Sequence, residues 1–354
     1  MSFENVILTD DLGLPSVMVR IPRFKWSDVY EGGEDIVFPA FIVGGKVVDC
    51  IYISKYLNVI EYDRAYSLPL RDPAHSINYD EARAACARKG KGWHLLTNAE
   101  WMALAHWCRK NGILPHGNTK AGCDVRHPEE KGKLLPVGFP NIPPEGRTLT
   151  GSGPASWTHD GTAESIHDLV GNVWDMVAGL RIVDGEIQII PDNDSALNID
   201  ESAGSPYWRA IATSGELVAP GGNTYKYDGE RDGSDAKTSA IVPTGVRLNT
   251  RIEHRQYTGD ERDGDYGYTC LPISQLGCAE GLSAHPLLIK LGLYPPEGHE
   301  SQELIFARNN GERMAIRGGS WYDGETAGMF HLYTRDSRKF IFPDIGFRCA
   351  FIET

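Results

Sequence analysis

The sequence has few cysteines and no paired cysteine motif. Its seven cysteines are scattered, and no two of them are separated by only two residues. This spacing argues against a disulfide framework and against a structural zinc site. It is typical of a protein made in a reducing compartment.

Long apolar runs and an excess of basic residues are also missing. No stretch approaches the about 18 uninterrupted apolar residues that a membrane span needs. The formal net charge is −13, which disfavours nucleic-acid binding through phosphates. Residues 1–16 have neither the basic nor the apolar region of a secretion signal. We therefore expect synthesis in the cytoplasm, no membrane insertion and no nucleic-acid partner, with carriage on a virion left open.

Glycine and proline are abundant instead. The 354 residues include 39 glycines and 21 prolines, and 41% of the chain is hydrophobic. This composition favours a loop-rich α+β or all-β protein over a helical one. The length is sufficient for one large domain or two smaller ones.

Local patterns predict several helices and strands. We expect strands over 17–22 and 50–54, hairpins over 41–49 and 180–190, and helices over 78–89 and 96–107. Thr97 and Glu100 have the spacing of a capping box, which marks the start of the last of these helices.

Three short motifs carry most of the information about the family. The first is Gly171-Asn172 followed by Trp174, where the Asn side chain can satisfy backbone groups that a turn exposes. The other two are Arg317-Gly-Gly-Ser-Trp321 and Gly346-Phe-Arg348. Together they resemble the formylglycine-generating enzyme (sulfatase-modifying factor) superfamily, which has a C-type-lectin-like fold.

The resemblance implies a fold and a domain organisation. The fold class would be α+β, of the C-type-lectin-like (formylglycine-generating-enzyme-like) kind, with long loops and insertions. Residues 1–15 would be an N-terminal arm and 16–354 one domain. Insertions would lie around 115–165 and 191–310, and a variable ligand-binding region would cover 317–351.

The catalytic residues of the enzyme branch do not carry over. That branch resembles a copper oxidase with two nearby cysteines before Gly-Phe-Arg, because soft thiolates bind Cu(I). Residues 322–345 contain no cysteine, and Cys349 matches only a structural position. We therefore expect that the protein is not an enzyme and requires no cofactor.

The C-terminal stretch resembles a narrower branch, the variable proteins of diversity-generating retroelements. In that branch, adenines of AAC codons in a template are rewritten, and the products include Tyr, Asp, His, Thr, Phe and Arg. Ten residues fit that set at template-like positions and are the predicted ligand-binding residues: Tyr322, Asp323, Thr326, His331, Tyr333, Arg335, Asp336, Phe340, Phe342 and Asp344.

These residues predict a recognition surface. Rigid aromatic side chains supply contact area at a low entropic cost, and scattered polar groups supply specificity. Alternation along a strand predicts Phe330 and Leu332 inward, with His331 and Tyr333 outward and exposed. Either Phe340 or Phe342 is expected to be exposed. Trp174 and Trp321 are predicted to be buried framework residues.

A calcium site is a further implication of the resemblance. In the enzyme family a structural calcium is held by a layout that Asp168, Gly171, Val173 and Asp175 match, and oxygen ligands suit this ion. A turn held only by hydrogen bonds is the alternative, and the sequence leaves the two interpretations open.

The resemblance therefore implies a receptor-binding protein whose C-terminal surface is diversified by a retroelement, such as a phage tail adhesin. Its partner would be a protein or other receptor on the surface of a host or neighbouring cell, and an oligomer is compatible with this function. The alternatives are a sulfatase-modifying-factor-like oxidase and an unvaried structural component of a virion.

Overall fold

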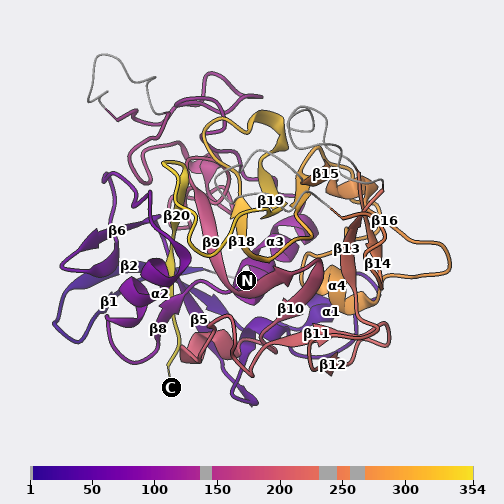
Figure 1. The fold of residues 1–354 in the computed structure, drawn as a ribbon. Coiled ribbons are helices and arrows are strands. Elements are labelled where there is room, and N and C mark those ends of the chain that lie inside the picture. Colours follow the sequence, from indigo (N-terminus) through magenta and orange to yellow (C-terminus); the bar gives the residue numbers. More distant parts are fainter. Residues whose placement is uncertain (1–2, 136–145, 231–244, 256–267, 354) are drawn as a thin grey trace.

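A computed structural model of the chain describes residues 3–135, 146–230, 245–255 and 268–353. This part of the chain is mainly sheet, with few helices and long loops (Figure 1). Parts of the predicted insertions around 115–165 and 191–310 lie outside the described ranges. No helix in those ranges has both the length and the apolar character that a bilayer span requires.

The first sheet brings the two ends of the chain together. Its strands, in spatial order, are β1 (Glu4–Thr9), β2 (Pro15–Pro22), β5 (Cys50–Ser54), β21 (Cys349–Phe351) and β8 (Trp93–Leu95). β21 pairs with both β5 and β8, and Ala350 lies opposite Ile53 on one side and His94 on the other. The last strand of the chain is therefore fixed inside the sheet. β1, within the predicted N-terminal arm, pairs with β2.

The second sheet contains the strands that carry the three motifs. Its order is β15 (Thr269–Pro272), β17 (Leu304–Ala307), β19 (Gly328–Thr334), β18 (Glu312–Gly318), β9 (Trp174–Val183), β10 (Glu186–Ile189), β13 (Lys226–Gly229), β14 (Val246–Asn249) and β16 (Gly277–Cys278). β11 (Arg209–Ile211) and β12 (Leu217–Val218) extend it from β10, and β20 (Ile345–Phe347) pairs in parallel with β9. β9 is thus the strand that joins the motif near residue 171 to the two C-terminal motifs.

Four α-helices and two small hairpins complete the described fold. They are α1 (Trp26–Val29), α2 (Tyr79–Ala87), α3 (Asn98–Lys110), α4 (Pro286–Lys290), β3 (Ile42–Val43) with β4 (Lys46–Val47), and β6 (Asn58–Glu61) with β7 (Arg64–Ser67). The predicted capping box is confirmed, because Thr97 accepts the backbone N–H of Glu100 while Glu100 accepts that of Thr97. The predicted hairpins at Gly44-Gly45 and Asp184-Gly185 are confirmed as well.

The β9–β18–β19 part of the second sheet is buried on both faces. Phe330 and Leu332 of β19 belong to the larger hydrophobic core, which also includes six residues of α3. Trp174 and Ile316 belong to a second core beside α2 and β8. A strand in this position has no solvent-facing side, which decides where the C-terminal side chains lie.

Candidate ligand-binding site

The glycine turns of two motifs bind each other directly. The Gly171 N–H donates to the Gly318 carbonyl at 3.3 Å, and the Trp321 N–H donates to the Asn172 carbonyl at 3.1 Å. The Asn172 side chain accepts from the Thr148 N–H and donates to the Thr148 carbonyl. Its amide therefore satisfies backbone groups of a neighbouring loop at Thr148, and not those of its own turn as expected.

Position 318 requires glycine both because of its backbone conformation and because a neighbouring carbonyl leaves no room for a side chain. Its φ is +91°, a region that L side chains rarely adopt. A Cβ at this position would lie 2.5 Å from the carbonyl oxygen of Leu169. Any larger residue would therefore push apart the two turns that support the C-terminal segment.

Arg317 ties the same turn to the start of α3. Its side chain is fully buried and donates to the Asn98 Oδ1 and to the carbonyls of Leu291 and Gly292. Burial lowers the pKa of Arg317 to about 10, so it remains a cation at neutral pH. Its hydrogen bonds are what make that buried charge tolerable.

Arg348 links the third motif to the first. Its guanidinium lies 2.9 Å from the Asp175 carboxylate and donates to the carbonyls of His167 and Asp168 at 3.0 and 2.8 Å. All four residues are buried. The three motifs therefore form one connected framework beneath residues 321–345.

The predicted calcium ligands lie at this junction. The Asp175 carboxylate is bound by Arg348, whereas Asp168 accepts the Gly151 N–H with one oxygen. Burial raises the pKa of Asp168 to about 6. A guanidinium already neutralises one of the two predicted carboxylate ligands. The calcium site at Asp168, Gly171, Val173 and Asp175 stays a prediction.

Eight of the ten predicted ligand-binding residues line one cavity, which we call the C-terminal pocket. Its volume is about 210 Å³. The eight are Tyr322, Asp323, Tyr333, Arg335, Asp336, Phe340, Phe342 and Asp344. They come from three places, namely the turn after β18, the end of β19 and the loop before β20, so only the tertiary structure gathers them.

Aromatic rings form the rim and one wall of the C-terminal pocket. Tyr322 is 58% exposed and Phe342 is 46% exposed. Phe340 is partly buried and stacks on Phe342 with ring centroids 6.0 Å apart. Tyr333 is also partly buried and packs on Trp174 at 5.3 Å, so the prediction that it is largely exposed is wrong. Of the two phenylalanines, Phe342 is therefore the exposed one.

Three carboxyl groups meet in the same pocket. Burial raises the pKa of Asp323 and of Asp336 to about 6, and it also raises the pKa of Asp344. Hydrogen bonds from the Ser320 N–H and hydroxyl oppose this shift at Asp323, and Arg335 opposes it at Asp336. The pocket thus holds more acidic groups than basic ones, in partly dry surroundings where charge interactions are strong.

Two predicted ligand-binding residues do not line the pocket. The Thr326 hydroxyl donates to the Asp323 carbonyl at 2.7 Å. His331 is fully buried, so the prediction that it is exposed is wrong. The period-two alternation of β19 is present, but its second face is covered by Trp174 and Phe306, whose rings lie 4.5 and 5.7 Å from the imidazole. Trp321 is only partly buried, which corrects its assignment as a core residue.

His331 gives a prediction about acid stability. Within the described ranges neither ring nitrogen has a hydrogen-bond partner, and burial lowers the pKa of His331 to about 3. The unfolded chain therefore binds this proton more readily from pH 6.5 down to about 3, and stability falls in that window. Substituting His331→Phe should remove the effect and gain about 2 kcal/mol relative to the native protein at pH 5.

Thermal melting of both proteins at pH 7 and pH 5 checks this. The difference between the native protein and the His331→Phe variant should widen at pH 5. Equal acid sensitivity in the two proteins would show that His331 is protonated, or reachable by water, in the folded state.

The sequence did not predict the pocket's floor. Trp174, Phe306, Ile316 and Ile345 line it together with the predicted residues. Phe306 lies on β17 opposite Tyr333 in a parallel pairing. No local motif marks Phe306, because its place depends on a contact between distant segments.

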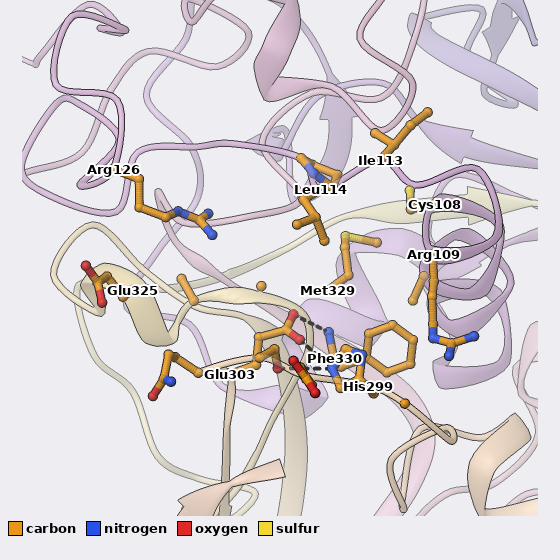
Figure 2. Close-up of a pocket in the computed structure, with 18 residues that line it drawn as sticks. Cys108, Arg109, Ile113, Leu114, Arg126, His299, Glu303, Glu325, Met329 and Phe330 are labelled. Carbon is orange, nitrogen blue, oxygen red and sulfur yellow. Dashed lines mark hydrogen bonds and ion pairs between the residues drawn. The ribbon is translucent and has the colours of Figure 1, made fainter. Parts of the chain in front are cut away.

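A second cavity, of about 420 Å³, lies between α3 and the start of β19 (Figure 2). In it the Nε2 of His299 lies 3.0 Å from the Ser301 hydroxyl and 2.9 Å from the Glu303 carboxylate. A Ser–His–acid triad needs its serine and its acid on opposite ring nitrogens. Because both partners share one nitrogen here, this cluster does not fit hydrolase chemistry.

The remaining polar groups of the second cavity have structural contacts. Glu303 accepts the Phe330 N–H at 2.9 Å and so holds the start of β19. The Cys108 thiol donates to the His159 carbonyl, and burial raises its pKa. A raised pKa keeps this sulfur a thiol and a poor nucleophile at neutral pH.

Two other cysteines lie next to each other in the core. Cys86 and Cys349 are both fully buried, and hydrogen bonding between them contributes to a Cys86 pKa that burial raises well above its ordinary value. Copper(I) binds thiolates, not thiols. This buried pair therefore does not provide the exposed thiolates that a copper oxidase would need.

The comparisons with known proteins add little beyond this. No protein-family model matches the sequence, and no curated protein does. Among solved structures, PvdO from Pseudomonas aeruginosa is 13% identical, with a TM-score of 0.34 and 98% of each chain covered. A Major Tropism Determinant P3c variant is 11% identical, with a TM-score of 0.30. The match covers 99% of this chain and 72% of the chain of that variant. Likenesses of this size carry no argument about function.

Proposed function

We propose that this protein binds a ligand through the C-terminal pocket and that a retroelement diversifies the residues lining it. The observation that carries the proposal is the gathering of Tyr322, Tyr333 and Phe342 with five other predicted variable residues around one cavity. Sequence resemblance chose these residues without regard to their place in space, so their meeting is an independent indication.

The framework beneath the pocket suits side chains that vary. Arg317, Gly318 and Arg348 fix the backbone through buried contacts that do not involve the rim. Side chains such as Tyr322 and Phe342 can then change at little cost to stability, because exposed substitutions usually have small effects. We also propose that the fold is C-type-lectin-like. In this fold the first sheet fixes both chain ends, and the second sheet presents the variable loop.

The pocket chemistry favours a ligand with a positively charged group. The pocket is lined by three aspartates, Asp323, Asp336 and Asp344, but by only one arginine, Arg335. Tyr322 and Phe342 offer ring faces at the rim, and a cation over such a face gains about 0.5–2 kcal/mol. A lysine or arginine side chain on a cell-surface protein has this chemistry. The protein would then act as a receptor-binding adhesin, not as an oxidase, and its chemistry requires no cofactor.

A display library tests the proposal without knowledge of the natural ligand. The codons of the eight predicted residues that line the pocket are randomised together at their adenine-derived positions, and a matched library randomises eight buried framework positions. Most members of the first library should resist protease and yield specific binders to a purified protein such as lysozyme. Few members of the second should fold. If the first library folds no better than the second, the pocket is core and the proposal fails.

A paired substitution tests the rim itself. Changing Tyr322 and Phe342 to Ser should alter the free energy of unfolding by about 0.5 kcal/mol or less for each residue. In a lysozyme binder selected from the library that retains both residues, the same change should weaken binding at least about 30-fold, the effect of losing a single aromatic anchor worth roughly 2 kcal/mol. Titration calorimetry and urea denaturation give the two values.

The control substitution is Tyr62→Ser, which removes an aromatic ring that is 80% exposed and lies on the turn between β6 and β7. It should leave both values unchanged. If the control weakens binding as much as the rim variant does, the selected binder does not use the C-terminal pocket.

A further inference from the structure

We propose that His116, His127 and Glu130 bind a divalent transition metal ion of the zinc class. The ligand atoms that these three side chains offer lie within 4.8 Å of one another. Two imidazoles and one carboxylate form a ligand set that zinc accepts, with a fourth position open to water. The cysteine spacing had predicted no zinc site, and this ligand set contains no cysteine.

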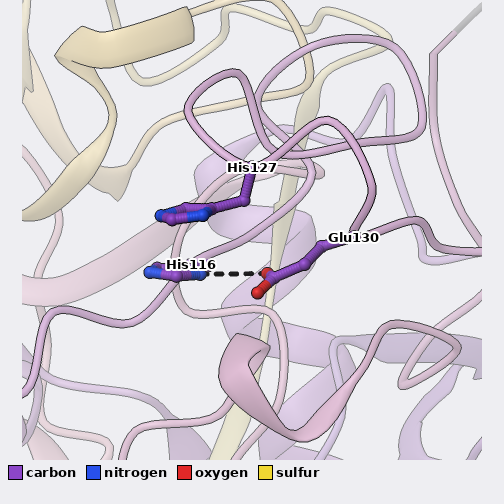
Figure 3. A group of neighbouring side chains, drawn as sticks. All are labelled: His116, His127 and Glu130. Atoms are coloured by element: carbon purple, nitrogen blue, oxygen red, sulfur yellow. Dashed lines mark hydrogen bonds and ion pairs between the residues drawn. The ribbon is translucent and has the colours of Figure 1, made fainter.

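The three side chains already face one another (Figure 3). The imidazole rings of His116 and His127 stack with centroids 4.1 Å apart, and the His116 Nδ1 lies 2.9 Å from the Glu130 Oε2. A tetrahedral zinc ion needs its ligand atoms about 3.3 Å apart, given bonds of about 2.0–2.1 Å. The lone pairs of two stacked rings lie in parallel planes and do not meet at one point, so metal binding requires one imidazole to turn. Because the His127 side chain is 42% exposed, we expect His127 to be the ring that turns.

The backbone around the site is fixed in advance by Asp124. This residue is fully buried, and its carboxylate accepts the N–H groups of Gly117, Arg126 and His127 at 3.1, 2.8 and 3.1 Å. It therefore holds both the residue after His116 and the backbone of His127. The backbone from which both imidazoles project is therefore fixed by contacts that leave the ring nitrogens available.

Glu130 is held in place by a buried indole. The Trp157 Nε1–H donates to its Oε2 at 3.0 Å. The Glu130 side chain is only 19% exposed, so its carboxylate is fixed next to the two imidazoles before any cation binds.

The metal site would also stiffen one side of the C-terminal pocket. The same loop contacts the turn after β18, because the Ala121 N–H donates to the Trp321 carbonyl at 2.8 Å and the Gly324 N–H donates to the Thr119 carbonyl at 3.0 Å. Trp321 and Gly324 flank the pocket residues Tyr322 and Asp323. Zinc binding at residues 116–130 should therefore restrict the motion of that rim.

Zinc titration of the tag-free, EDTA-treated full chain tests the proposal. We expect one zinc ion bound per chain, a rise in melting temperature with zinc concentration, and cobalt(II) absorption of a four- or five-coordinate site. The His127→Ala and Glu130→Gln variants should each weaken zinc affinity by more than about 100-fold, beyond the range for outer partners. Their melting temperatures in EDTA should stay near that of the native protein.

The matched control is His75→Ala, which removes a surface histidine 4.0 Å from the Asp72 carboxylate. It should leave zinc affinity unchanged. Absence of stoichiometric binding, or equal affinity in the native protein and both ligand variants, would overturn the site. Either result leaves the ligand-binding proposal for the C-terminal pocket intact, because the display library tests that proposal separately.

Discussion

Replacing Arg348 with Met should lower the free energy of unfolding by about 3–5 kcal/mol, the usual cost of breaking a buried ion pair from one side. The variant keeps most of the side-chain volume but leaves the Asp175 carboxylate buried without its guanidinium. It also leaves the carbonyls of His167 and Asp168 without their donor. Urea denaturation followed by circular dichroism measures the loss.

Two further variants separate this account from a general packing effect. Arg23→Met breaks an exposed pair with Asp49, whose side chain is 88% exposed, and should cost no more than about 1 kcal/mol. Combining Arg348→Met with Asp175→Asn should recover part of the loss, because the double variant no longer buries an unpaired charge. If Arg348→Met costs no more than Arg23→Met, the three motifs are not joined through Arg348.

Replacing Trp174 with Ala should cost about 3–5 kcal/mol, as other large core truncations do. Trp174 is 3% exposed and packs on His331 and Tyr333 with ring centroids 4.5 and 5.3 Å away. Its loss would open a cavity beneath the C-terminal pocket and remove the wall on which Tyr333 rests. The pocket should therefore lose both stability and shape.

Trp321→Ala is the matched comparison. Trp321 is only partly buried and lies under Arg147, with the guanidinium 5.7 Å from the ring. Its truncation should cost clearly less than that of Trp174 in the same urea denaturation experiment. An equal or larger cost for Trp321→Ala would mean that the rim turn, not β9, is the main support of the pocket.

Much of the local structure could be predicted from sequence because its causes are local. Thr97 and Glu100 form their capping box within one helical turn, and Asp184-Gly185 closes a hairpin between adjacent strands. The turn expected at Gly171-Asn172 is local as well, and Gly171 adopts a φ of +73° that glycine tolerates.

The burial of His331 could not be predicted in this way. Alternation along β19 tells which side chains share a face, but not whether a face is covered. The cover comes from Phe306 and Trp174, on strands that neighbour β19 only in the folded sheet. A strand covered on both faces and a strand exposed on one face can have the same alternating sequence.

The two candidate sites differ in the same respect. Eight residues that line the C-terminal pocket were marked in the sequence by the family resemblance, and their role in binding stays a prediction. His116, His127 and Glu130 have no spacing typical of metal ligands, and they meet only because Asp124 and Trp157 fold the loop around them. Irregular loops bring ligands together through contacts that no periodic pattern records.

The central claim is that residues in the C-terminal pocket vary by retroelement action on a fixed framework. Sequencing the gene and its flanking DNA in many isolates of the source organism tests it most directly. The account predicts a nearby reverse transcriptase, a near-copy of the codons for 317–351, and differences confined to adenines of that copy at codons such as those for Tyr322, Tyr333 and Phe342. A locus without such a copy, or with substitutions spread evenly over codons for Gly318, Phe347 and the rim alike, would contradict it.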